Sequence, residues 1–327
     1  MNDRVTKISI LVLMLGMALI PLNDSLIKLL SSRFPLAQIV VIRALICIFI
    51  IAIIGQGAKK TLLLPRRTLI LFSIRGMCLV IAMYFFFVAL ASLPLSTVVS
   101  IFFISPLLIT FLSSIVLNER IGIHRVTSVI TALIGVMFVM KPGTSEFHPE
   151  MLLALGSAVS YAIFQIFTRS LKSDGNLPAL ITIQHLCYFF SALPLLAFNW
   201  SGGLSSTGNM SFDFLLRGTV SPTLTEIIYI SICAGAVLFL SLASSFAYRN
   251  VEASLIAPFE YIAIPVSVVW GIVIWGDYPS SSAWVGMGLI IASGIYVIYR
   301  ERVNNVEIVS SIPMPGSAGM VRNKKDD

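Results

Sequence analysis

Hydrophobic and polar positions of this chain alternate in long blocks. Apolar stretches of about twenty residues follow one another, and a helix of that length crosses the hydrocarbon core of a bilayer. Short polar connections with turn residues separate them. The pattern predicts ten transmembrane helices, with ends set only to within several residues, near 8–30, 36–55, 68–91, 95–117, 123–140, 150–170, 178–199, 224–247, 251–275 and 283–299.

One of these stretches occurs twice. Residues 89–119 and 247–277 align without a gap at an offset of 158 positions. Each copy begins with a small polar turn, continues through an apolar run that contains a proline, and closes with a carboxylate. The repetition indicates that the chain consists of two repeats of the same arrangement of helices.

Each half holds five predicted spans, and an odd number makes the second half enter the membrane from the opposite face. At an offset of 141 positions, Asp24 and Arg43 align with Gln165 and Gln184, which supports the division. We predict an all-α integral membrane protein with two inverted five-helix repeats. They lie at 8–140 and 150–299, a Gly/Ser-rich loop lies at 201–223, and a disordered cytoplasmic tail follows at 300–327.

Composition and charge agree with this class of protein. The mean hydropathy is +0.95 and only 11% of the residues are charged, whereas about a quarter are charged in soluble domains. The net charge of +7 lies mainly in loops on one side, where Lys and Arg orient a membrane protein, so no nucleic-acid partner is expected. The opposite loops carry only Arg33, Lys141 and Arg217, which predicts an inner-membrane protein with both termini in the cytoplasm.

Charged residues within the predicted spans are candidates for function, because insertion of each costs at least about 2.5–3.5 kcal/mol. They are Asp24, Lys28, Arg43, Arg75 and Glu260. Glu260 is the strongest candidate, since prolines on both sides of it break the helix and free backbone carbonyl groups. Its carboxyl group could carry a coupling proton or bind a cationic substrate group, or it could form a fixed salt bridge with Arg43.

The other four charges have competing interpretations. Asp24 and Lys28 are four residues apart on one helix, so they could pair with each other or open to bind a substrate, and Lys28 could also extend to the interface. Arg43 could bind a substrate anion or pair with Asp24 or Glu260. Arg75 lies near basic residues at the start of its span, which favours an anchor at the membrane surface.

Uncharged polar residues within the spans add further candidates for substrate binding or coupling. Tyr84, Tyr161, Gln165 and Gln184 could donate or accept hydrogen bonds, although a contact between packed helices is the commoner role for such residues. The aromatic side chains of the spans could stack on a planar substrate, or they could simply fill the core and face lipid.

Prolines and carboxylates of the repeated stretch are candidates for gating. Pro106 and Pro265 lie in the middle of their spans, where a missing N–H weakens the helix, and discontinuous helices are typical of secondary transporters. Glu119 and Asp277 close the two copies at opposite faces of the membrane. They could be gate contacts or terminal helix caps.

The sequence holds no signature of an enzyme. It contains no HExxH, no GxSxG and no glycine-rich phosphate loop. Its four cysteines lie in apolar runs without the spacing of metal ligands. We therefore expect no catalytic residue, no metal and no cofactor.

Several motifs carry a family resemblance. LPLSTVVSIFFISPLLITFLSSIVLNE, its counterpart APFEYIAIPVSVVWGIVIWGD and Arg43 lie within two five-span repeats. In these features the chain resembles the EamA-type transporters of the drug/metabolite transporter superfamily over residues 8–299. MKPGTSEFHPE and YAIFQIFTRSL are similar to bacterial carriers for riboflavin or S-adenosylmethionine uptake. The chain has Asp277 where the family commonly has Glu.

The resemblance implies a central cavity, lined mainly by the first, third, fourth, sixth, eighth and ninth spans. The expected function is secondary transport of a small organic metabolite by alternating access, such as uptake of a flavin or an S-adenosylmethionine-like compound with a proton as coupling ion. Within the same fold, the alternative is an exporter of amino acids or metabolites. A multi-span membrane enzyme or a non-transporting scaffold is the alternative from another class.

Overall fold

A computed structural model describes residues 3–54, 61, 64–116, 123–171, 177–204, 207–251 and 253–311. These residues form helices joined by short connections, with one isolated β-bridge between Gly203 and Arg217. The elements are α1 (Asp3–Leu30), α2 (Leu36–Ile54), α4 (Arg66–Ser92), α5 (Leu95–Phe102), α6 (Ser105–Val116), α7 (Ile123–Met140), α8 (Glu150–Ser170), α9 (Leu177–Trp200), α10 (Met210–Leu216), α11 (Leu224–Asn250), α12 (Ala253–Ile256), the 3₁₀-helix η1 (Ala257–Ile262), α13 (Ala263–Trp275) and α14 (Ser281–Ser311).

Seven stretches of the described residues are long and apolar enough to cross a membrane as single helices. They are Arg4–Leu30, Leu36–Ile54, Arg66–Ser92, Leu95–Ser113, Glu150–Ser170, Leu177–Trp200 and Leu224–Asn250. Shorter apolar helical stretches lie at Ile130–Met140, Phe259–Trp275 and Ser281–Tyr296. Each of these ten stretches falls on an apolar block of the sequence. In lipid, the backbone N–H and C=O groups of such a block have no water to bond, and a helix pairs them with one another.

Two of the helical rods are interrupted. The α-helical pattern stops between α5 and α6 at Phe103 and Ile104, and Pro106 is the second residue of α6. In the second half, the tighter η1 separates α12 from α13, and Pro265 is the third residue of α13. A proline lacks the N–H that would continue an α-helical ladder, so both interruptions lie where the sequence removes a backbone donor.

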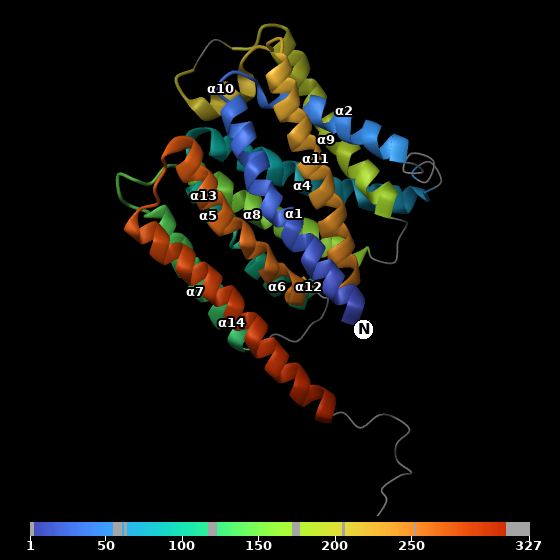
Figure 1. Ribbon diagram of the computed structural model, residues 1–327, viewed down its shortest axis with the longest axis vertical. Helices are drawn as coiled ribbons and strands as arrows, with labels where there is room; N and C mark the ends of the chain where they lie inside the picture. Colours follow the sequence, from blue (N-terminus) through green and yellow to red (C-terminus); the bar gives the residue numbers. More distant parts are fainter. Residues whose placement is uncertain are drawn as a thin grey trace, which may run out of the picture.

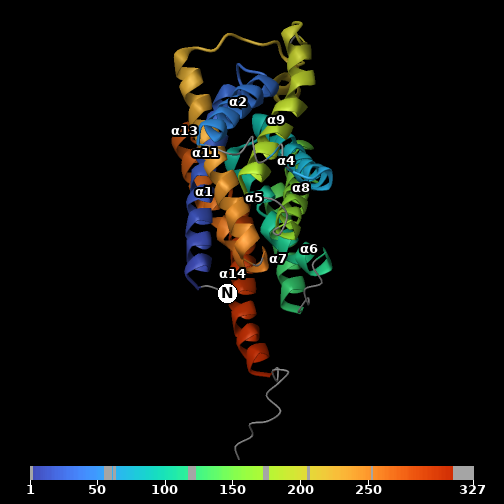
Figure 2. The same ribbon diagram turned by 90° about the vertical axis from the view of Figure 1, so that its right-hand side faces the viewer.

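The helices pack in pairs that join the two halves of the chain. The helix α1 lies along α11, and α4 lies along α8. The helix α2 lies on α9, while α7 and α14 form a pair on one flank of the bundle (Figures 1 and 2). Hydrophobic side chains from both halves fill one main core, so the halves are not separate globular units.

Two glycines bring α7 and α14 into close contact. A methyl group added at Gly135 would lie 2.8 Å from the carbonyl oxygen of Gly286, and one added at Gly286 would lie 2.5 Å from the carbonyl oxygen of Gly135. Small residues permit this approach of two helix backbones in a membrane. The pair is therefore held by close backbone packing at one crossing point.

The last helix is longer than the sequence predicted. The expected disordered tail begins at residue 300, but α14 continues to Ser311 and extends past the rest of the bundle (Figures 1 and 2). No proline or glycine occurs between Ile295 and Ile312, so nothing in the backbone chemistry ends the helix there. Residues 312–327 lie outside the described part of the chain.

The predicted loop at 201–223 contains the short helix α10, which the sequence analysis missed. The side chain of Asn209 caps this helix by accepting hydrogen bonds from the backbone N–H groups of Ser211 and Phe212. The Ser211 hydroxyl donates to the carbonyl oxygen of Val88 at 2.7 Å. This contact fixes the loop on the end of α4.

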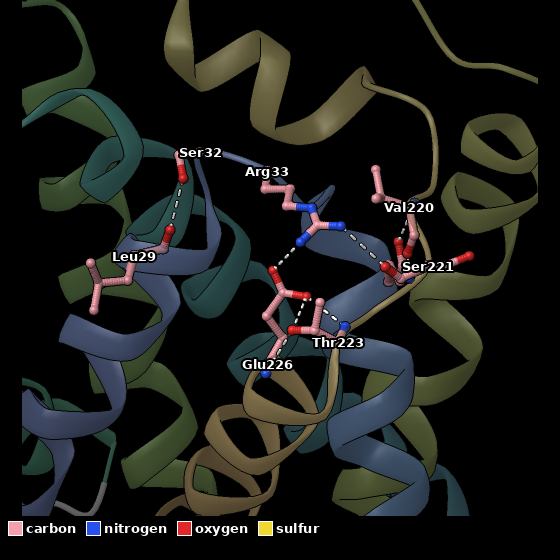
Figure 3. Close-up of polar contacts among 8 residues, drawn as sticks. Leu29, Ser32, Arg33, Val220, Ser221, Thr223 and Glu226 are labelled. Atoms are coloured by element: carbon pink, nitrogen blue, oxygen red, sulfur yellow. Dashed lines mark hydrogen bonds and ion pairs between the residues drawn. The ribbon is translucent and has the colours of Figure 1, made fainter.

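Polar contacts also join the α1–α2 connection to the start of α11 (Figure 3). The Arg33 guanidinium donates to the Glu226 carboxylate at 2.6 Å and to the backbone carbonyl of Ser221 at 3.4 Å. Glu226 also accepts from the backbone and hydroxyl of Thr223, which forms a capping box at the first turn of α11. The two halves are thus tied together at this end of the bundle.

Candidate substrate site

A cavity of about 140 Å³ lies in the middle of the bundle. Side chains of α1, α2, α4, α5, α8, α9, α11 and the first residue of α13 line it. A site of this size can hold several water molecules or part of an organic molecule. The lining includes the helices that the resemblance implied, and it adds α2 and α9.

Most of the lining is apolar and aromatic, with a few polar groups that converge on the same space. Phe86, Phe87, Phe102 and Phe164 contribute rings, and Phe102 lies 5.1 Å from the ring of Tyr161. Apolar walls with few polar groups are typical of sites for small organic ligands. The cavity is therefore the candidate substrate site.

Two opposite charges face this cavity. Asp24 of α1 and Arg43 of α2 both line it, and both are almost fully buried. Asp24 accepts a hydrogen bond from the Asn23 side-chain amide at 2.8 Å, and Arg43 donates to the Met83 sulfur at 3.2 Å. Neither forms an ion pair with the other or with Glu260, so the structural pairings considered for Arg43 are absent from the described residues.

Glu260 lies in η1 and is completely buried. Its Oε1 accepts hydrogen bonds from the hydroxyl groups of Tyr248, at 2.8 Å, and Tyr161, at 3.0 Å. Its Oε2 has no hydrogen-bond partner among the described residues. Tyr161 lines the cavity, so one tyrosine hydroxyl connects the carboxylate to the candidate substrate site.

A second polar side chain extends this connection. Gln165 of α8 donates from its amide nitrogen to the Tyr161 hydroxyl at 2.6 Å and to the Ser244 hydroxyl at 2.8 Å. Ser244 belongs to α11 and lines the cavity. The chain of contacts from Glu260 to Ser244 therefore crosses three spans, and it joins an acid of the second half to the central space.

Lys28 does not pair with Asp24, contrary to one of the two predicted arrangements. Its ammonium group donates to the carbonyl oxygen of Leu93 at 2.7 Å, lies 4.0 Å from the Asp277 carboxylate and sits 5.0 Å from the centre of the Trp275 ring. Carbonyl groups at a helix C-terminus attract a cation, and Leu93 follows the last residue of α4. The spacing of four residues would permit a pair between Asp24 and Lys28, but the ammonium group instead contacts Leu93, Asp277 and Trp275.

Arg75 is not a surface anchor, and this prediction was wrong. The residue is completely buried. Its guanidinium donates to Thr168 at 2.7 Å, to Gln184 at 3.2 Å and to Ser245 at 2.9 Å, and it stacks on the Phe164 ring at 4.1 Å. The position of Arg75 in the sequence indicates its depth in the membrane but not the direction of its side chain. The rotation of α4 about its axis directs this side chain into the bundle.

The remaining candidates are distributed as follows. Gln184 lines the cavity and joins Arg75 to Ser241, to which it donates at 2.7 Å. Tyr84 is half-buried on α4 and does not line the cavity. Asp277 lies just after α13 beside Lys28, and Glu119 lies outside the described residues. The gating roles of these carboxylates and of the two mid-span prolines stay predictions.

Tyr248 is the contact of Glu260 that the sequence analysis missed. The residue lies near the end of an apolar span and is completely buried. A signal was present, because the repeated stretch has Leu90 where the second copy has Tyr248 and Phe102 where it has Glu260. The polar member of each aligned pair belongs to the second copy, and in the structure the two polar members contact each other.

Comparisons with known proteins find similarity to membrane transporters. Residues 7–141 match the EamA-like transporter family. An S-adenosylmethionine uptake transporter of Rickettsia bellii is 24% identical over 92% of this chain and 98% of its own length. That of Rickettsia prowazekii is 22% identical over 86% and 89%. A riboflavin transporter of Vibrio cholerae is 24% identical over 64% of each chain.

A solved crystal structure of another protein has the same fold. It superposes with a TM-score of 0.64 at 16% sequence identity and covers 93% of this chain and 99% of that one. The apolar helices support a multi-pass membrane protein, and the family match and the names of the relatives support a transporter rather than an enzyme. Over residues 7–141 the chain resembles the EamA-like transporter family, and its relatives include carriers named for S-adenosylmethionine and riboflavin, the resemblance that the sequence motifs predicted.

Proposed function

We propose that this protein is a secondary carrier that moves a small organic metabolite through the central cavity by alternating access. The observation that carries the proposal is the cavity itself. It lies between helices of both halves, and charged and aromatic side chains face it. A carrier of this kind binds its substrate near the middle of the membrane and opens to each face in turn.

The proposed architecture has ten spans in two inverted repeats, at 8–140 and 150–299. The packing supports it. Exchange of the two halves converts the α1–α11 pair into the α8–α4 pair, and it converts each of the pairs α2–α9 and α7–α14 into itself. The aligned residues Phe103 and Tyr261 also contact each other, with ring centres 6.1 Å apart.

We propose that the protein lies in the inner membrane with both termini in the cytoplasm. The support for this orientation is the concentration of Lys and Arg on one side of the predicted spans. Reporter fusions after Ser311 and within residues 141–149 test it, because the first should report the cytoplasm and the second the opposite side. The reverse pattern would contradict the orientation.

The proposed substrate is an S-adenosylmethionine-like or flavin-like compound taken up into the cell. The relatives that cover most of this chain carry the first name, and others carry the second. Aromatic rings in the lining support a planar group in the substrate, since offset stacking stabilises such contacts.

Glu260 is the proposed coupling residue. A buried carboxylate with one unpartnered oxygen is costly in an apolar setting, and protonation removes its charge. Tyr161 lines the cavity and donates to the carboxylate of Glu260. Binding of a substrate in the cavity can therefore change how readily Glu260 gains or releases a proton. We expect the two interrupted helical rods to move during transport. Pro106 and Pro265 lie at the interruptions, and Asp277 follows the end of α13.

Purified protein in liposomes tests the proposed function. Uptake of labelled S-adenosylmethionine, riboflavin and amino acids is measured with and without an imposed proton gradient. We expect uptake of at least one compound above that of protein-free liposomes, and faster uptake with the gradient. Equal uptake in liposomes with and without protein, for every compound, would contradict the proposal.

A further inference from the structure

Asp24 and Arg43 are opposite charges that face one mainly apolar cavity without pairing with each other. We infer that the transported molecule is a zwitterion, with a cationic group bound by Asp24 and a carboxylate or similar anion bound by Arg43. The inference rests on the proposed transport function and specifies the class of its substrate.

Most N–H groups of the Arg43 guanidinium have no hydrogen-bond acceptor among the described residues. The residue is 3% exposed, and the only hydrogen-bond acceptor it reaches among the described residues is the sulfur of Met83. A thioether sulfur is a weak acceptor. The rings of Phe87 and Tyr188 lie 5.7 and 5.6 Å from the guanidinium carbon and hold the group in place. The planar fork of an arginine in this setting suits a carboxylate, which can accept two parallel hydrogen bonds.

Asp24 is in a complementary position on α1. It is 4% exposed, and its hydrogen-bond donor among the described residues is the neutral amide of Asn23. Lys28, the nearest cation along the helix, is held at Leu93 and Asp277. The Asp24 carboxylate therefore forms no ion pair with a cation of the described residues while it faces the cavity.

A zwitterion satisfies both groups at once. A ligand with a single charge would pair with one of the two residues and leave the other charge in an apolar space, where an unpaired charge is costly. A neutral ligand would leave both charges unmatched. The remaining lining, with Phe86 and Phe102, can accommodate the apolar or aromatic part of the molecule.

Two sets of three matched compounds test the inference in liposomes. One set is tryptophan, tryptamine without the carboxylate, and indole-3-propionate without the amine. The other is S-adenosylmethionine, its decarboxylated form, and its 2-oxo acid form without the amine. Each unlabelled compound competes with uptake of the labelled zwitterion of its set. The proteins are the wild type, Asp24→Asn, Arg43→Gln, and the surface controls Glu146→Gln and Arg33→Gln, which replace exposed residues.

In at least one set, we expect the wild type to prefer the parent compound to the analogue without the amine and to the analogue without the carboxylate by about tenfold or more, as for a hydrogen bond to a charged group. Asp24→Asn should lose the discrimination against the analogue without the amine, and Arg43→Gln should lose that against the analogue without the carboxylate. The two surface controls should discriminate as the wild type does. This crossed pattern is specific to charge recognition, because a variant that merely folds poorly would lower uptake of every compound alike.

The inference is overturned if the wild type moves riboflavin but neither parent compound, or if the analogues without the amine and without the carboxylate compete as well as the parent compounds in both sets. It is also overturned if each variant loses all compounds equally while it remains monodisperse and inserted. Uptake of riboflavin alone would leave the proposed function standing. Absence of flux for every compound, riboflavin included, would contradict the proposed function as well.

Discussion

Single side chains decide which charges in the bundle are available for chemistry. Arg75 has three neutral hydrogen-bond partners and a stacked ring, so three of its five N–H donors are already used. Among the described residues, Glu260 has two tyrosine donors on one oxygen and none on the other. Both charges lie deep within spans, but contacts on all sides hold the guanidinium of Arg75, whereas one carboxylate oxygen of Glu260 has no hydrogen-bond donor among the described residues.

Substitution of Glu260 tests the coupling role. We expect Glu260→Gln to abolish uptake driven by a proton gradient, because an amide cannot gain and release the proton. Exchange of labelled for unlabelled substrate without a gradient should persist, since the cavity is intact. Gradient-driven uptake at the wild-type rate, with the same dependence on pH, would rule the role out.

Arg75 is instead expected to stabilise the fold. Arg75→Lys removes the fork that reaches α8, α9 and α11, and loss of two hydrogen bonds to a charged group should destabilise the protein by about 3 kcal/mol or more. Thermal unfolding of the purified protein measures this effect. The exposed Arg66→Lys on the same helix is the control and should melt like the wild type. Equal melting temperatures for the two variants would contradict the account.

At the scale of the elements, the apolar blocks were sufficient to predict the long helices. The predicted span at 36–55 and the helix Leu36–Ile54 differ by one residue, because an apolar run bounded by a proline and a polar loop leaves little choice. The helix α10 was missed because seven mixed residues carry no such signal. The contacts of Arg75 were missed because the sequence does not specify how far a helix is rotated about its axis.

The pair α7–α14 gives a test at this scale with a built-in control. Gly286→Ala places a methyl group 2.5 Å from a backbone oxygen of α7, so the helices must separate, at a cost of about 1–3 kcal/mol. Gly288→Ala on the same helix meets nothing within 4 Å and should be neutral or slightly stabilising. Thermal unfolding distinguishes the two variants. A Gly286→Ala protein as stable as Gly288→Ala would show that the close crossing is unimportant.

At the scale of the whole molecule, the sequence predicted the class of protein and four residues that line the cavity, namely Asp24, Arg43, Tyr161 and Gln184. It could not predict that the two charges would stay unpaired with each other or that Lys28 would turn to Asp277. Such pairings depend on which helices of the two halves become neighbours. Local spacing along one helix does not contain that information.

Blocking the cavity tests the central claim, that substrate passes through this space, most directly. Val237 lines the cavity from α11, whereas Ile232 on the same helix is 43% exposed on the outer surface of the bundle. Uptake of the compound that the wild type transports is measured for Val237→Trp and Ile232→Trp in liposomes with equal amounts of inserted protein. We predict that the first variant loses uptake and the second retains it. Equal uptake by both would contradict a route through the central cavity.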